Sequence, residues 1–342
     1  MLIPLYILIG VLGGAARLGA TVKFLIYTMA GSLVMLAAIV VYGLKVGTFD
    51  LVNAPTSPSR WIFLGFMLAF AIKAPLFPFH GWLPDAYREA PPEVTAVLSG
   101  VVAKAGTYGM LRIAITQFPD PSGYYRTLFL ALGAAALVYG SLLAFRAPDF
   151  RGVVAYSSMA QSGLITIGLF SGTNLGFDGA VLQMVAHGLV STSLFLVAGA
   201  VERRTTTGEF SLLGGMAKGR PALTTLLVTL GVISLAVPGS AAFAGEFLIL
   251  AGAFQRHWWW AVIGASGVVL AAMYMLRLIS AVLHQARGPV VSDGALDLRA
   301  GELALIVPLV AALLVLSAWP AGISSHAFAG DSPVDAVIGQ FH

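Results

Sequence analysis

The sequence predicts an all-α polytopic membrane protein with about ten transmembrane segments, and three observations lead to this fold class. Hydrophobic residues make up 58% of the 342 residues, charged residues make up 10%, and the mean hydropathy is +0.89. A soluble domain carries roughly 25% charged residues, so lipid must surround most of this chain. Apolar runs of about the length that crosses the hydrocarbon core recur throughout. Two of these runs contain prolines near a charged residue, as in discontinuous helices.

Composition also narrows the chemistry that the chain can perform. There is no cysteine, which excludes disulfides, cysteine-ligated zinc and cysteine-bound iron–sulfur clusters. We therefore expect no cofactor on this chain and place any redox chemistry on other subunits. The net charge of +4 is better explained by membrane topology than by binding to nucleic acid.

We expect ten apolar segments. The first is too short to span the bilayer alone, and it lacks the basic start and cleavage pattern of a signal peptide. It is predicted to be the second half of a helix whose beginning is absent. In chain order, the segments cover residues 1–14, 20–44, 61–79, 94–115, 127–145, 152–171, 177–201, 222–254, 258–283 and 303–318.

The connections between segments carry an uneven distribution of lysine and arginine. Cytoplasmic loops are enriched in these residues, so the richer side is predicted to be cytoplasmic, with both termini of the chain outside the cell membrane. Arg112 and Arg277 lie towards segment ends, where their side chains can reach the interface. The poorer side holds Lys45, Arg60, Arg126 and Arg256, and the richer side holds Arg17, Lys23, Arg88, Arg146, Arg151, Arg203, Arg204, Lys218, Arg220, Arg287 and Arg299.

Prolines interrupt the third and the eighth segments. Pro75 and Pro78 follow Lys73, and Pro238 precedes Glu246. Proline removes a helical hydrogen bond, and in lipid such a break persists only where protein or water satisfies the freed backbone groups. The two segments are five helix positions apart and run in opposite directions, as expected for an inverted repeat. We predict a single membrane domain over residues 1–342, with an incomplete first repeat at 1–118, a second repeat at 125–285, and a final helix and tail at 300–342.

Three ionisable residues fall inside apolar segments, namely Lys73, Lys104 and Glu246. Each buried charge costs roughly 2.5–3.5 kcal/mol on insertion scales, so such residues persist where they are paired, hydrated or neutral. Burial favours the neutral form of both residue types, which allows proton exchange when a neighbouring charge changes. The pattern favours a proton path. The alternative interpretation is a static ion pair that fixes helix packing.

Histidine and serine supply further candidates. His187 lies in the middle of a segment, where it suits either a proton relay or simple packing, and His80 follows the first break. Neither histidine has the partners of a metal site nearby, so no metal is predicted. Ser157, Ser158 and Ser162 are expected to form hydrogen bonds across helices or to water.

Several motifs resemble those of the proton-antiporter-like membrane subunits of respiratory complex I, the NADH–quinone oxidoreductase, and among these the M-type subunits most. The resemblance runs along the whole chain. The motifs are KAPLFPFHGWLPDA at residues 73–86, EAPP at 89–92, AKAGTYG at 103–109, AYSS at 155–158, QMVAHGL at 183–189, and PG at 238–239 followed by FAGEF at 243–247.

This resemblance implies roles for four residues in proton translocation. Lys73 matches the lysine of the family's first broken helix, and Lys104 matches the lysine of the helix that follows it. His187 and Glu246 match a histidine and the glutamate of the second broken helix, where the other antiporter-like types usually carry lysine. The implied partners are other membrane subunits of a complex I-like assembly, the lipid bilayer and protons, with quinone reduction on other subunits.

The chain departs from the family pattern in two places. Family members have further helices ahead of the present start, together with a glutamate that pairs with the residue matching Lys73. We expect the sequence to be N-terminally truncated for this reason. The motif at 155–158 usually leads to a histidine, whereas this chain has Gln161, which cannot titrate. A relay step there is expected to run through water.

Three other functions stay open from the sequence. The chain could belong to a multisubunit cation/proton antiporter, to a membrane-bound hydrogenase, or to a complex in which it is a scaffold without translocation. The residues do not distinguish protons from sodium. A lipid-modifying enzyme would need a catalytic carboxylate or metal cluster at the interface, and we identify no such group in the sequence.

Overall fold

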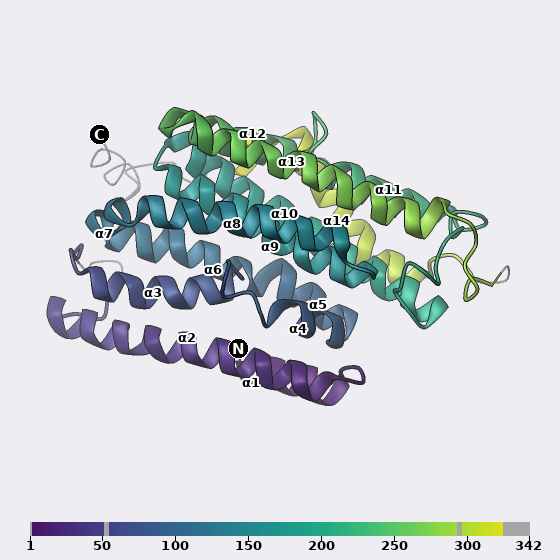
Figure 1. Cartoon of the computed structure of the whole chain (residues 1–342), viewed down its shortest axis with the longest axis horizontal. Helices are drawn as coiled ribbons and strands as arrows, with labels where there is room; N and C mark the ends of the chain where they lie inside the picture. The colour runs from purple at the N-terminus through teal and green to yellow at the C-terminus, as the bar shows by residue number, and fades with distance from the viewer. Residues whose placement is uncertain (1, 51–54, 293–295, 324–342) are drawn as a thin grey trace.

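The structure, a computed structural model, describes residues 2–50, 55–292 and 296–323. In this part of the chain, long helices lie side by side and form one elongated bundle (Figure 1). Met1 and the predicted tail at 324–342 lie outside the described residues. The helices are α1 (Leu2–Leu12), α2 (Arg17–Val46), α3 (Arg60–Lys73), α4 (Leu83–Glu89), α5 (Pro92–Val97), η1 (Leu98–Val102), α6 (Lys104–Gly109), η2 (Met110–Ile115), α7 (Pro119–Tyr124), α8 (Arg126–Arg146), α9 (Phe150–Ser171), α10 (Asn174–Thr205), α11 (Pro221–Ser234), α12 (Ala241–Arg256), α13 (Trp258–Ile279), η3 (Ser280–His284) and α14 (Ala300–Ala318).

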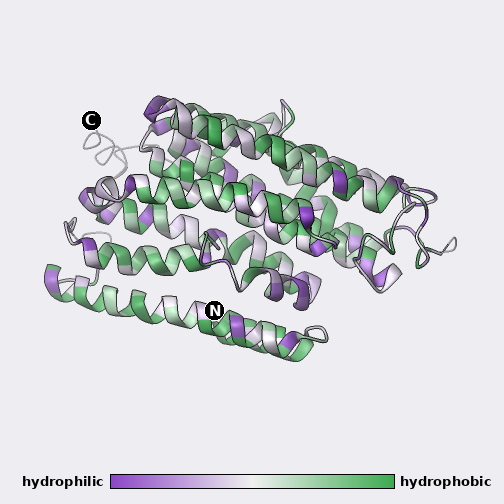
Figure 2. Cartoon of the chain, viewed as in Figure 1, coloured by the Kyte–Doolittle hydropathy of each residue, from purple (hydrophilic) through white to green (hydrophobic). Residues whose placement is uncertain are grey.

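The predicted all-α membrane fold is confirmed. Among the described residues, seven helices are long and apolar enough to cross a bilayer. Apolar residues cover the length of the bundle, while hydrophilic residues gather towards its ends (Figure 2). The shorter helix α1 begins near the middle of the bundle, in agreement with a first segment that cannot span alone (Figure 1). The count of ten segments stays a prediction.

Helices α9 and α10 form the centre of the bundle. Nearly every residue of α9 is buried, whereas α2 keeps only a few buried positions. Helix α9 packs along α8, and α10 packs along α9 and α12. Because α9 and α10 are enclosed, a polar side chain on their facing sides must find its partner inside the protein.

The first predicted break is confirmed between α3 and α4. Helix α3 ends at Lys73, the chain crosses a proline-containing turn, and α4 begins at Leu83. The indole Nε1 of Trp82 donates to the carbonyl of Ile72 at 2.9 Å. This contact satisfies one of the carbonyl groups that the end of α3 leaves without a helical partner.

The second predicted break is confirmed between α11 and α12. Ala236 and Gly239 adopt positive φ angles of 50° and 92° in the turn that separates the two helices. The hydroxyl of Ser240 then caps α12 by accepting from the backbone N–H of Phe243 at 3.2 Å. Ser317 of α14 accepts from the N–H of Ala241 at 2.9 Å, so a neighbouring helix also supports this terminus.

The segment predicted as one helix at 94–115 is a continuous helix, Pro92–Ile115, that contains two π-helical stretches. It runs through α5, the π-helix η1, α6 and the π-helix η2, and Lys104 is the first residue of α6. A π-helix contains more residues per turn than an α-helix and is frequent at functional sites. Sequence periodicity does not reveal such short insertions, so these π-helical stretches were not predicted.

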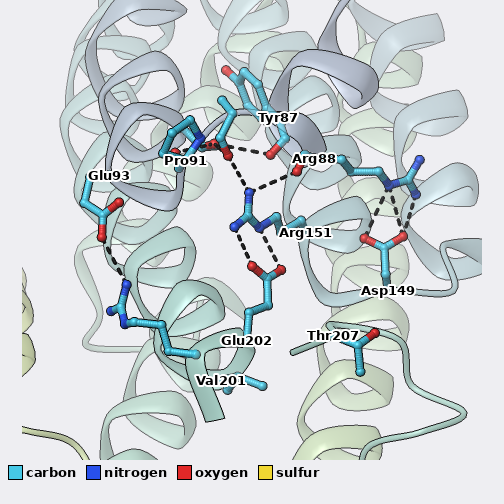
Figure 3. Close-up of polar contacts among 12 residues, drawn as sticks. Tyr87, Arg88, Pro91, Glu93, Asp149, Arg151, Val201, Glu202 and Thr207 are labelled. Atoms are coloured by element: carbon cyan, nitrogen blue, oxygen red, sulfur yellow. Dashed lines mark hydrogen bonds and ion pairs between the residues drawn. The ribbon is translucent and has the colours of Figure 1, made fainter. Parts of the chain in front are cut away.

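Ion pairs hold the end of the bundle where Arg88, Arg151 and Arg203 lie, called the basic end below (Figure 3). Arg151 of α9 pairs with Glu202 of α10 and donates to the carbonyls of Arg88 and Ala90 at 3.0 and 2.6 Å. These carbonyls belong to the end of α4. Arg151 therefore fixes the second half of the first broken helix against the two central helices.

Candidate functional site

Lys104 is a buried cation held by a backbone carbonyl. Its side chain extends back along its own helix, and Nζ donates to the carbonyl of Ser99 in η1 at 3.0 Å. Only 8% of the residue is exposed. Among the described residues no carboxylate pairs with Lys104, so the static ion pair considered from the sequence is not formed at this position.

Ser158 connects the surroundings of Lys104 to His187. The hydroxyls of Ser99 and Ser158 lie 3.1 Å apart, and Nε2 of His187 lies 3.3 Å from the same Ser158 oxygen. The three residues come from η1, α9 and α10 in turn. A hydroxyl can donate and accept at once, so the arrangement is a continuous hydrogen-bonded connection between three helices.

Glu246 lies in a second polar group, formed by two glutamines. Its Oε1 accepts from Nε2 of Gln161 at 2.9 Å and from Nε2 of Gln183 at 3.4 Å. Gln183 also donates to Oε1 of Gln161 at 2.8 Å. Within the described part of the chain, the other carboxylate oxygen of Glu246 is buried and has no hydrogen-bond partner. Glu246 is thus surrounded by neutral donors and not by a cation.

The two polar groups follow each other along the same pair of helices. Gln183 and His187 are four residues apart on α10, and Ser158 and Gln161 are three residues apart on α9. Residues at these spacings are neighbours on one helix face, with about 5–6 Å between their Cβ atoms. Together the groups make one polar stripe through the centre of the bundle, from Lys104 to Glu246.

A glycine allows α12 to bring Glu246 into this stripe. A Cβ atom on Gly245 would lie 2.6 Å from Oε1 of Gln183 and 3.0 Å from its backbone nitrogen. Any larger residue would push the two helices apart. The glycine before Glu246 in the sequence therefore has a packing role that places the carboxylate against α10.

Lys73 lies apart from the stripe. It is half-buried at the end of α3 and lines a small cavity of about 20 Å³ with Thr28 and Ser32 of α2. In the described residues its ammonium group has no hydrogen bond or ion pair. Of the four residues predicted from the sequence, the structure brings Lys104, His187 and Glu246 into one region and leaves Lys73 on the side of α2.

The prediction for the serines is confirmed at Ser158 alone. Ser157 donates to the carbonyl of Val154 and Ser162 donates to that of Ser158, both within α9. His80 stacks on Phe77 and meets Tyr139 edge-on, with ring centroids 5.9 and 5.5 Å away, and takes no part in the stripe.

Sequence reasoning missed Ser99 and Gln183 as members of the site. The spacing of Gln183 four residues before His187 places both on one face of a helix, and this signal could have identified it. Ser99 carries no comparable signal, because its position depends on the π-helix η1. Gln161 was noted only as a departure from a family motif, whereas it donates the shortest hydrogen bond to Glu246.

Comparison with protein families identifies one match over most of the chain. Residues 1–273 match the family described as NADH:quinone oxidoreductase/Mrp antiporter, transmembrane. The NADH-quinone oxidoreductase subunit M of Mycobacterium tuberculosis H37Rv is 40% identical over 341 residues, covering 94% of this chain and 61% of the relative. The subunit of the same name from Rickettsia prowazekii is 37% identical, covering 94% and 67%. The chain thus spans 61% of the length of the mycobacterial relative.

Solved structures show the same arrangement of helices. A chain of respiratory complex I from Thermus thermophilus with bound NADH superposes with a TM-score of 0.89 at 33% identity, covering 99% of this chain and 72% of the other. A chain of the Mrp complex from Dietzia sp. DQ12-45-1b gives a TM-score of 0.84 at 21% identity, covering 99% and 74%. At that identity the second likeness concerns the fold alone.

Proposed function

This chain belongs to the NADH:quinone oxidoreductase/Mrp antiporter transmembrane family, and from this premise we propose that it is a proton-translocating membrane subunit of an NADH–quinone oxidoreductase-type complex. Protons move through its buried lysine, histidine and glutamate residues, coupled to quinone reduction on other subunits. Its partners are the other membrane subunits of that complex and the surrounding lipid.

One observation carries the proposal. Lys104, His187 and Glu246 lie along a single polar stripe inside an apolar bundle, and the described residues provide no opposite charge that would hold Lys104 or Glu246 in a static pair. A group that is buried without a counter-ion can gain or lose a proton without breaking an ion pair. A purely structural role would favour paired charges, because an unpaired one costs several kcal/mol.

The residues of the stripe divide into those that hold protons and those that transmit them. Lys104, His187 and Glu246 each accept and release a proton at a nitrogen or a carboxylate oxygen. The hydroxyls of Ser99 and Ser158 bond to each other, and Ser158 bonds to His187. Lys104 donates to the backbone carbonyl of Ser99, so a water between its Nζ and the Ser99 hydroxyl completes the proton route from Lys104 to His187. Gln161 and Gln183 cannot titrate, so the step from His187 to Glu246 proceeds through water beside their amides.

The two broken helices supply water to this path. Helix α3 runs from the end opposite the basic end towards the middle, and α11 runs from the basic end towards the middle. Helix α3 ends at Lys73, and Glu246 is in the second turn of α12, the helix that follows the second break. This opposite orientation supports an inverted repeat with the incomplete half at 1–118 and the second half at 125–285. Protons enter beside one break and leave by Glu246.

The basic end is proposed to face the cytoplasm, with the protein in the plasma membrane. The connections at this end hold Arg17, Arg88, Arg151 and Arg203, and the opposite end holds Arg60 and Arg256. The last residues of α14 then lie on the extracytoplasmic side. Two variants, Lys218→Cys and Arg256→Cys, test this orientation. A membrane-impermeant thiol reagent added from the outside should label position 256 and leave position 218 unlabelled; the reverse pattern would overturn the orientation.

The function is tested in the assembled complex with Lys104→Ala and Glu246→Gln. Each variant should reduce proton pumping to below about a tenth of the unaltered level, since each removes a group that must hold a proton. Ser162→Ala is the control, because its hydroxyl bonds only to its own helix. Full pumping in both variants would overturn the path. A double variant, Lys104→Met with Glu246→Gln, that assembles and pumps normally would identify the chain as a scaffold.

A further inference from the structure

A groove lies on the surface of the bundle beside Lys104. Its volume is about 870 Å³, and it lies between the η1–α6–η2 segment and α10, with Leu309 of α14 at its margin. Its lining is mainly apolar. Gly100 and Gly188 lie at the floor of the groove, where the two segments pack closely. A Cβ on Gly100 would lie 3.1 Å from the carbonyl of Gly188, so a larger residue would crowd this contact. Val101 and Val185 line the groove and are 60% and 38% exposed.

Two cations line this groove at different depths. Lys104 is central in the apolar segment Pro92–Ile115. Arg112 follows eight residues later, which corresponds to about 12 Å along a helix axis. Half of the hydrocarbon core measures about 15 Å. When Lys104 lies near the middle of the bilayer, the backbone of Arg112 therefore lies about 3 Å inside the edge of the hydrocarbon core, and its long side chain reaches the lipid phosphates by snorkelling.

Arg112 has an exposed side chain and no protein partner for its charge. The residue is exposed, and within the described part of the chain its guanidinium forms no hydrogen bond or ion pair. The other lipid-facing arginine near a segment end, Arg277, differs in this respect, since it donates to the carbonyls of Phe145 and Ala147 at 2.7 and 2.8 Å. An unpaired guanidinium whose side chain reaches the phosphate level is suited to bidentate binding of a phosphate group.

We propose that the groove is a binding site for one phospholipid of the leaflet opposite the basic end. Arg112 binds the phosphate, and one acyl chain lies in the groove and reaches to Lys104. The match rests on three features: an apolar groove on the surface of the bundle, an unpaired cation among its lining residues, and a separation of about 12 Å that lets the side chain of Arg112 reach the phosphates when Lys104 is at mid-membrane. The binding site does not depend on the proposed proton path.

A bound acyl chain would separate Lys104 from the bulk of the membrane. Lys104 lines the groove, and its ammonium group points towards Ser99 on the inner side. With the groove filled by lipid, hydration of Lys104 from the outer side is blocked. The hydroxyls of Ser99 and Ser158 are then the polar connection that remains available to it.

Photo-cross-linking tests this inference. The full chain, in its complex, is placed in nanodiscs that contain phosphatidylglycerol with a diazirine in the middle of one acyl chain, and the modified peptides are mapped by mass spectrometry. Unaltered protein should be labelled at Val101 and Val185. Arg112→Gln should reduce this labelling roughly five- to tenfold. Arg256→Gln is the matched control, because Arg256 is also an exposed arginine at the same end of the bundle.

Val185→Trp provides a second variant that does not depend on the charge. Val185 is exposed, so the larger ring fills the groove without entering the core, and it should abolish labelling of Val101 while the complex remains assembled. Equal groove labelling in Arg112→Gln and unaltered protein would overturn binding through the phosphate. Absence of groove labelling in the unaltered complex would overturn the proposal altogether.

Discussion

Gln161 of α9 donates a hydrogen bond of 2.9 Å to Glu246 of α12, across the most enclosed part of the bundle. The carboxylate is 3% exposed, yet the groups around it are amides and not cations. An amide stabilises the charged form through its dipole without fixing that form as strongly as an arginine would. The contact therefore holds α12 in place while leaving the carboxylate able to change its charge.

Gln161→Leu should weaken both the packing of α12 and proton pumping. The change removes the shorter of the two hydrogen bonds to Glu246 and leaves only the contact of 3.4 Å from Gln183. A buried acceptor that loses its donor costs about 1–3 kcal/mol, so the thermal unfolding midpoint should fall, together with proton pumping. Gln161→His keeps a ring N–H donor and should retain most of both. Unaltered pumping in Gln161→Leu would show that the carboxylate does not rely on this amide.

Ser158→Ala should interrupt the connection between Lys104 and His187. The variant removes the hydroxyl that lies 3.1 Å from Ser99 and 3.3 Å from His187, so pumping should slow at least severalfold with little change in assembly. Ser158→Thr keeps a hydroxyl and should restore part of the rate. The comparison is made by proton uptake into proteoliposomes. Equal rates for Ser158→Ala and the Ser162→Ala control would argue for a route that bypasses Ser158.

Gly106→Ala should disturb the contact between α6 and the end of α3. The added Cβ would lie 2.7 Å from the backbone nitrogen of Ala74 and 2.9 Å from the carbonyl of Phe70, and backbone atoms cannot easily move aside. Overpacking of this kind costs about 1–3 kcal/mol, and it should appear as a lower melting temperature. Gly19→Ala is the control. That glycine has no heavy atom within 4 Å of the added position, so the change should stabilise α2 slightly.

Asp297 should make the basic end sensitive to acid. Burial raises its pKa, but hydrogen bonds from the backbone N–H groups of Ala222, Leu223 and Leu298 outweigh this, and the pKa lies below the usual value of 3.8. A group whose pKa is lowered by folding contributes stability above its unfolded pKa and loses it as the pH falls through its folded pKa.

Asp297→Ala is the corresponding variant. It should lower stability by roughly 1 kcal/mol at neutral pH, because α11 loses acceptors for two N-terminal N–H groups. Its deficit should shrink as the pH falls below about 4. Thermal unfolding between pH 3 and 7 measures the effect. A deficit that is independent of pH would mean that the capping does not depend on the charge.

Much of the fold could be predicted from the sequence, because apolar length and proline positions depend on local chemistry. The breaks after Lys73 and before Glu246 are in the predicted places. The π-helical stretches η1 and η2 on either side of Lys104 could not be predicted, since a π-helix arises from tertiary packing that leaves no periodic signal. For the site, sequence reasoning found the ionisable residues. It did not find the neutral ones, such as Gln183, because a glutamine in an apolar helix has many structural explanations.

The π-helix η1 has a consequence for how this part of the chain can vary. Residues in an α-helix advance by about 100° each, so one residue more or less before Lys104 turns its side chain by roughly that angle. The wider turn of η1 accommodates an extra residue, and with this turn the ammonium group of Lys104 points to the carbonyl of Ser99. Deleting a single residue from η1 could leave a regular helix of nearly the same length, yet aim the ammonium group at a different neighbour. In this segment, the number of residues before Lys104 therefore determines the direction of its side chain.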